Sequence, residues 1–193
     1  GMVIAPASGR QLATLQDMFE GKGLETFIAE NGSAVWYKGE IVSTKPMDED
    51  VVRTVLTAAA ESDAPIHPVL CKPEYALIAS DLPDAVFSEI SKYYHSRRPV
   101  SSLLEAAKTS EAPTIKVSFF VETNAEEAGL QVAQSAVGQN IAVSGANWVD
   151  IMSPETNKGF ALRALADTLH VDIADTAAIG DYLNDYEMLQ TAG

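Results

Sequence analysis

The order of strand, helix and strand at the start of the chain constrains its fold more than any other feature. Residues 2–6 begin with the continuous apolar run Met-Val-Ile-Ala, which is typical of a strand buried on both faces. Residues 11–20 predict a helix whose apolar face carries Leu12, Leu15 and Phe19. Residues 26–42 predict a further strand that continues through an Asn-Gly turn into a hairpin. Because a helix joins the first two strands, we expect them to be parallel, as in an α/β fold.

The middle of the chain predicts a second α/β layer. Helices are expected at 47–62, 84–96 and 124–137, and strands at 67–71, 75–80 and 114–122. The last of these strands mostly alternates apolar and polar residues, so we expect one wetter face. The first pattern then returns, with a strand at 148–152, a helix at 153–170, a buried strand at 177–180 and a helix from residue 184. We therefore predict a core formed by residues 1–44 and 138–193, with a cap domain, residues 45–137, inserted into it.

Composition and charge exclude several classes of partner. The formal net charge is -14 and the pI is near 4.4, so the surface should repel phosphate backbones and we expect no nucleic-acid partner. No stretch is long and apolar enough to span a membrane, and the first residues lack the pattern of a signal peptide. The single cysteine, Cys71, cannot form an internal disulfide, which favours the cytoplasm.

Four polar clusters lie at predicted strand ends or helix starts: Ser8-Gly9-Arg10, Asn31-Gly32, Asn157-Lys158-Gly159, and Asp181 with Asn184 and Asp185. Each has a structural explanation. Ser8 suits a turn, Asn31-Gly32 is a turn signal, Asp181 suits a loop, and Asn184 and Glu187 have capping-box spacing. Lys158 is harder to explain in this way, because a cation in the first turn of a helix opposes the helix dipole. A bound anion that Lys158 shares with the helix N-terminus would account for it.

Taken together, the clusters indicate a site for phosphate-monoester chemistry. Such a reaction requires a cation and hydrogen-bond donors around the phosphoryl oxygens. Lys158 supplies the charge, while the Ser8 hydroxyl and the neighbouring amides supply donors. Mg²⁺ prefers oxygen ligands, which Asp181 and Asp185 offer.

These segments give the chain a resemblance to the Cof-type (type IIB) phosphatases of the haloacid dehalogenase superfamily. The matching segments are Ile-Ala-Pro-Ala-Ser-Gly-Arg, Ile-Ala-Glu-Asn-Gly-Ser-Ala-Val-Trp, Val-Asp-Ile-Met-Ser-Pro-Glu-Thr-Asn-Lys-Gly-Phe-Ala-Leu and Ala-Ile-Gly-Asp-Tyr-Leu-Asn-Asp-Tyr-Glu-Met-Leu. The resemblance implies a Rossmann-like core with an inserted α/β cap, and Mg²⁺ as cofactor. It implies catalytic roles for Ser8, Lys158 and Asp181, and a metal site at Asp181 and Asp185. Phosphate binding is assigned to Ser8, Gly9, Arg10, Asn31, Lys158 and Asn184, and the implied substrate is a small phosphorylated metabolite such as a sugar phosphate.

The chain departs from this family at its start. The family's Asp-x-Asp-Gly-Thr motif, which carries the nucleophile on a strand upstream of residues 2–6, has no counterpart here. We therefore expect a truncated gene product or a piece of a longer chain, inactive by itself. The alternative is a non-catalytic protein that keeps a phosphate or metal half-site. In the family the upstream strand lies between those at 2–6 and 177–180. Here we expect these two strands to pair directly, or to pair across a homodimer.

Overall fold

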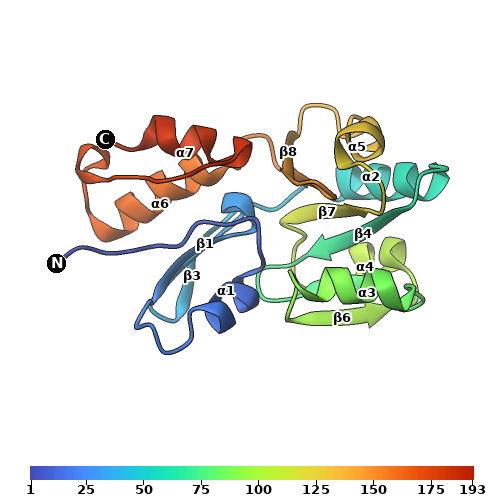
Figure 1. Cartoon of the computed structure of the whole chain (residues 1–193), viewed down its shortest axis with the longest axis horizontal. Helices are drawn as coiled ribbons and strands as arrows, with labels where there is room; N and C mark the ends of the chain where they lie inside the picture. Colours follow the sequence, from blue (N-terminus) through green and yellow to red (C-terminus); the bar gives the residue numbers. More distant parts are fainter.

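The computed structural model describes residues 1–193, and two β-sheets organise the chain (Figure 1). The first sheet has the order β1-β2-β3 and the second has the order β6-β5-β4-β7-β9-β8. The elements are α1 (Leu12–Met18), β1 (Thr26–Ala29), η1 (Glu30–Gly32), β2 (Ala34–Tyr37), β3 (Glu40–Thr44), α2 (Glu49–Glu61), β4 (Ile66–Cys71), β5 (Ala76–Ala79), α3 (Asp84–Ser91), β6 (Arg97–Val100), α4 (Leu103–Thr109), β7 (Lys116–Val121), η2 (Ala125–Gly129), α5 (Leu130–Ala133), β8 (Asn140–Gly145), β9 (Trp148–Met152), α6 (Lys158–Leu169), η3 (Ile173–Asp175), η4 (Leu183–Asp185) and α7 (Tyr186–Thr191). The predicted α/β fold class is confirmed.

The three-stranded sheet is an antiparallel meander packed between helices. On one face α6 contributes Ala161 and Leu165 to a cluster with Ile28 and Val35 of the sheet. On the other face α1 contributes to a larger apolar cluster that also contains residues of the second sheet. The predicted parallel pairing with the start of the chain is present as a single bridge between Ala7 and Ile28. The strand-helix-strand order therefore indicated the correct relative direction.

The six-stranded sheet is mixed, and β7 lies near its centre. Helices α2, α4 and α5 pack on one face, where they bury Val117, Phe119 and Val121 of β7. Helix α3 contributes Val86 and Ile90 to the cluster on the opposite face. The hairpin of β8 and β9 pairs with β7. This hairpin therefore belongs to the second sheet, and not to the core segment that the boundary at residue 138 predicted. The division into core and cap otherwise stays a prediction.

Some predicted elements differ in the structure. All six residues of β7 are buried, so the wetter face expected for this strand is absent. The reason is that Lys116 and Ser118 face buried carboxylates and not solvent. Strands β6 and β8 and helix α4 were not predicted, and the helix expected at 124–137 is limited to η2 and α5. No helix has both the length and the apolar character needed to cross a membrane.

The segments expected as buried strands at 2–6 and 177–180 are extended but form no strand. Met2 is 88% exposed and Ile179 is 97% exposed. The two segments do not pair with each other. They flank an apolar groove of about 530 Å³, whose floor includes Ile28, Leu162, Leu165, Leu169 and Met188. The backbone groups of residues 2–5 and 177–180 make no hydrogen bond within the chain. The expectation of direct pairing is therefore wrong, because the groove separates the two edges.

We expect the 193-residue chain to self-associate through this groove, because exposed apolar side chains and unpaired backbone groups favour strand pairing between copies. Light scattering across a concentration series should give a mass above that of the monomer, and Ile179→Glu should lower it. Val137→Glu is the control, since Val137 is 86% exposed but does not line the groove. A strictly monomeric wild-type chain would contradict the homodimer prediction.

Candidate active site

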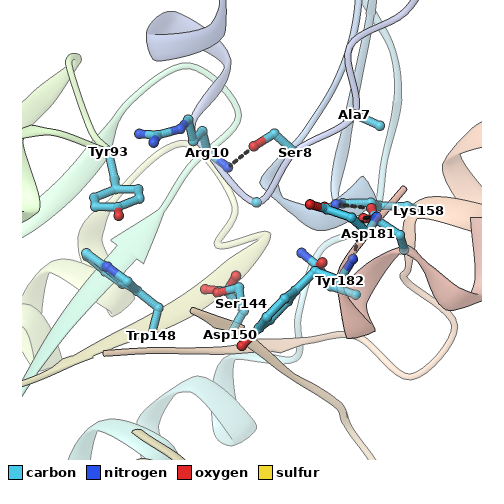
Figure 2. A pocket seen from close by; sticks show the side chains of 13 residues that line it. Ala7, Ser8, Arg10, Tyr93, Ser144, Trp148, Asp150, Lys158, Asp181 and Tyr182 are labelled. Carbon is cyan, nitrogen blue, oxygen red and sulfur yellow. Dashed lines mark hydrogen bonds and ion pairs between the residues drawn. The ribbon is translucent and has the colours of Figure 1, made fainter. Parts of the chain in front are cut away.

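Thirteen residues line a cavity of about 350 Å³ between the two sheets (Figure 2). They come from the loop before α1, the turn after α3, strands β8 and β9, the start of α6 and the segment before α7. Of the predicted site residues, the cavity brings together Ser8, Gly9, Arg10, Lys158, Asp181, Asn184 and Asp185. Asn31 does not line this cavity, but its side chain contacts Asn184. Segments far apart in sequence therefore converge on one cavity, and the binding roles of these residues stay predictions.

The loop Ser8–Arg10 forms one wall of the cavity. The Arg10 backbone N–H donates to Ser8 Oγ at 3.2 Å, and the Ser8 backbone N–H donates to the Ile28 carbonyl at 2.9 Å. The Arg10 guanidinium donates to the Lys92 carbonyl and lies 4.3 Å from the centre of the Tyr93 ring. Figure 2 shows it directed toward Tyr93, away from the end of the cavity that holds Lys158. The Arg10 side chain therefore lies at the aromatic end of the cavity and is directed away from Lys158.

Lys158 and Asp185 form a buried ion pair. The side chain of Asn157 caps α6 by accepting from the Phe160 N–H, which places Lys158 in the first turn. Lys158 Nζ lies 2.6 Å from Asp185 Oδ1. Burial acts to raise the pKa of Asp185, but the hydrogen bond and charge of Lys158, together with the backbone N–H groups of Tyr182 and Asp181, outweigh it and hold this pKa below its usual value. The ammonium of Lys158 is thus paired, with further donors left for a bound anion.

The Asp181 turn depends on Gly180 and Asp185. The second oxygen of Asp185 accepts from the backbone N–H groups of Asp181 and Tyr182. A Cβ on Gly180 would lie 2.5 Å from the Asp185 Cβ, so glycine is required for this close approach. The Asp181 side chain makes no hydrogen bond and is exposed. Of the two carboxylates in this turn, Asp185 therefore stabilises the turn, and Asp181 is free.

Asn31 is a buried connector. Its φ of 55° follows a φ of 52° at Glu30, so two successive residues adopt the left-handed conformation. Asn31 Nδ2 donates to Asp150 Oδ2 at 2.5 Å, and Asn31 Oδ1 accepts from Asn184 Nδ2 at 2.8 Å. Asn184 is therefore linked to Asn31, and the alternative explanation as a capping box with Glu187 is not supported.

Sequence reasoning missed the aromatic end of the cavity and Asp150. Tyr93 and Trp148 lie opposite Lys158 and Asp181 in Figure 2, with ring centres 5.0 Å apart. Nothing in the sequence around Tyr93 could have identified it. Asp150 did leave a signal, because a carboxylate inside the apolar run of 148–152 needs partners when buried.

The carboxylates of the cavity differ in what they can still bind. Both oxygens of Asp150 are engaged, by Ser118 and Asn31, and both oxygens of Asp185 are engaged as described above. No group of three or more His, Cys, Asp or Glu side chains is arranged to hold a metal ion. Mg²⁺ is bound in many sites by one or two carboxylates together with phosphate oxygens and water. Asp181, the carboxylate that makes no hydrogen bond, fits a weak site of that kind.

The comparisons with known proteins agree on one family. The family described as haloacid dehalogenase-like hydrolase matches residues 1–193. The chain is 27% identical to an HMP-PP phosphatase of Cronobacter sakazakii over 197 residues, which cover 100% of the chain and 70% of the relative. It is 24% identical to a putative phosphatase, YkrA, of Bacillus subtilis, covering 97% of the chain and 69% of that protein.

Two solved structures share the fold. A haloacid dehalogenase-like hydrolase from B. subtilis superposes with a TM-score of 0.84 at 20% identity, covering 100% of this chain and 76% of that one. The subclass IIB sugar phosphatase BT4131 superposes with a TM-score of 0.82 at 17% identity, covering 100% and 72%. At these identities the likeness establishes the fold alone.

Gly32→Ala should destabilise the chain far more than Gly39→Ala. The two glycines have φ of 97° and 96°, so each alanine costs about 1–2 kcal/mol of left-handed strain. Only at Gly32 would the Cβ also meet a backbone atom, the Asn157 carbonyl oxygen at 2.2 Å, which adds about 1–3 kcal/mol of overpacking. Urea unfolding measures both. Equal losses of stability in the two variants would mean that the turn at Gly32 does not pack against the start of α6.

Asp185 should make the stability of the chain sensitive to acid. Its pKa is lower in the folded chain than in the unfolded chain, so its contribution is present above about pH 4 and is lost as the pH falls through the folded value. Asp185→Asn should cost about 1–3 kcal/mol at pH 7 and remove that part of the acid dependence. Urea unfolding between pH 3 and pH 7 tests this, and parallel profiles for the wild type and the variant would contradict it.

Proposed function

The chain belongs to the haloacid dehalogenase-like hydrolases, and we propose that it forms the phosphate- and metal-binding part of a Mg²⁺-dependent phosphatase. The substrate class is a small phosphorylated metabolite, such as a sugar phosphate. The relative named HMP-PP phosphatase and the sugar phosphatase that shares the fold support this class. Location in the cytoplasm, absence of a nucleic-acid partner and assembly as a homodimer stay predictions.

One observation carries the proposal: Ser8, Lys158 and Asp181 face one cavity although they come from opposite ends of the chain. In a protein with a net charge of -14, an anion needs a local cation, and Lys158 lies in the first turn of a helix, whose N-terminus also attracts anions. The Ser8 hydroxyl and the backbone of its loop offer donors on the facing wall.

Each residue has a separate task in binding. Lys158 keeps one hydrogen bond to Asp185 and directs its remaining donors to the phosphoryl oxygens. Ser8 donates its hydroxyl to the same group. Asp181, with Asp185 beside it, would hold Mg²⁺, which supplies charge to neutralise the phosphoryl oxygens. Asn184 and Asn31 hold the two sides of the site at a fixed distance through their shared hydrogen bond.

The second candidate, a non-catalytic phosphate-binding protein, also has an observation in its favour. Asp150 and Asp185 are engaged at both oxygens, which leaves Asp181 as the one free carboxylate of the cavity. With Asp181 assigned to the metal ion, the cavity offers no further free carboxylate to act as the nucleophile. The 193-residue chain should therefore bind phosphate without hydrolysing its esters.

We expect no turnover of an aryl phosphate by this chain in the presence of Mg²⁺. Release of the aryl alcohol, followed by absorbance, should equal that of a buffer blank. Turnover well above the blank and abolished by Asp181→Ala would show that the chain contains its own nucleophile.

Inorganic phosphate should bind weakly, and binding should weaken further in Lys158→Ala, by about tenfold for the loss of roughly 1.4 kcal/mol. Isothermal calorimetry with and without Mg²⁺ measures this, and chelation of Mg²⁺ should lower the affinity. Lys22→Ala removes the same charge from an exposed loop outside the cavity and is the matched control. Equal affinities of the wild type and Lys158→Ala would make Lys158 a structural residue.

A further inference from the structure

Lys116 is a fully buried lysine that does not line the cavity. It begins β7, and its ammonium reaches out of the six-stranded sheet toward the first part of the chain. Lys116 Nζ donates to the Gly9 carbonyl at 2.9 Å and lies 2.6 Å from Glu30 Oε2 and 3.4 Å from Asp150 Oδ1. One ammonium thus joins β7, β9, the strained turn η1 and the loop Ser8–Arg10.

The charges around Lys116 keep it protonated. Burial acts to lower the pKa of Lys116, but Asp150 and Glu30 together hold it well above its usual value. Glu30 is the weaker partner, since burial raises its pKa and, apart from the ion pair with Lys116, neither of its oxygens has a hydrogen-bond partner. A buried charge is retained only with such compensation, so Lys116 is fixed in place by its two carboxylates.

The contact with Gly9 links this buried cluster to the site. Gly9 stands between Ser8 and Arg10, which both line the cavity. A hydrogen bond to the Gly9 carbonyl fixes the peptide plane that carries the Arg10 N–H, and that N–H in turn donates to Ser8 Oγ. The loop also lies close to Asn31, because a Cβ on Gly9 would be 3.1 Å from Asn31 Nδ2.

We infer that Lys116 is the positioning residue of the anion-binding loop: it orients the peptide groups of Ser8–Arg10 from within the six-stranded sheet, so that phosphate affinity depends on a side chain that never touches phosphate. This inference rests on the proposed phosphate site. Its physical basis is preorganisation, since donors already aligned lose less entropy when an anion binds.

The chain offers a matched control in Lys72. This lysine is also buried. It comes directly after β4 of the six-stranded sheet, next to Cys71, which pairs with Lys116. Its ammonium donates to the Ala112 carbonyl at 2.9 Å and to Thr114 Oγ1 at 3.0 Å, on the side of a different cavity. Lys72→Met therefore removes a buried lysine of the same sheet without touching the loop.

The test compares Lys116→Met, the double variant Glu30→Gln with Lys116→Met, and Lys72→Met. Calorimetry measures the affinity for inorganic phosphate, urea unfolding measures stability, and amide NMR follows Gly9 and Arg10. Lys116→Met should lose stability and about tenfold or more in affinity, as expected for misplaced binding groups. The double variant removes one uncompensated carboxylate, so it should regain stability while its affinity stays low. Lys72→Met should lose stability and keep its affinity within about twofold.

Wild-type affinity in a folded double variant, with unchanged Gly9 and Arg10 amide signals, would overturn the inference and make Lys116 a structural residue only. The NMR measurement separates this inference from the proposed function. If the wild type does not bind phosphate, the proposed function fails. A shift of the Gly9 and Arg10 signals in the double variant, absent in Lys72→Met, would still support the positioning role, and its absence would refute that role.

Discussion

The side-chain amide of Asn31 is the interaction on which the arrangement of the site depends. It donates to Asp150 of β9 and accepts from Asn184 in the segment before α7, so one buried group connects both sheets to the end of the chain. Two strained residues in succession, Glu30 and Asn31, place this amide, and such strain persists only where surrounding contacts maintain it. Here those contacts are Asn157 beyond Gly32 and Lys116 beside Glu30.

The buried polar groups form one continuous network below the cavity. Glu30, Lys116, Ser118 and Asp150 are all nearly inaccessible to water, and each except Glu30 has its hydrogen-bonding groups largely satisfied. Removing one member of such a network destabilises the chain, because the remaining buried polar groups lose a hydrogen-bond or ion-pair partner. The cavity wall is therefore stiff on the side of the six-stranded sheet and open at Asp181, where the carboxylate faces solvent.

The apolar groove between the segments 2–6 and 177–180 has, in contrast, few hydrogen bonds along its edges. The segments 2–6 and 177–180 lead to Ser8 and Asp181, yet the backbone groups of residues 2–5 and 177–180 make no hydrogen bond within the chain. Two side chains of the proposed site thus follow segments that make few hydrogen bonds of their own. This places the best-supported half of the site at Lys158, Asp185 and Asn31, on helix α6 and the turns that contact it.

The sequence by itself determined the family and the α/β class, while the roles of the site residues stay predictions. The Cof-type resemblance is confirmed, and the residues of its motifs gather in or beside one cavity. Only the tertiary structure decided which of these groups are free. Local pattern cannot reveal that Asp185 is bound to Lys158, that Asn31 links Asp150 to Asn184, or that Lys116 reaches Gly9, since these partners are separated by 27 to 153 positions. The tertiary structure also decided that the apolar runs at 2–6 and 177–180 are not strands. A strand forms only where a neighbouring strand supplies hydrogen bonds, and the presence of that neighbour is a property of the fold and not of the segment.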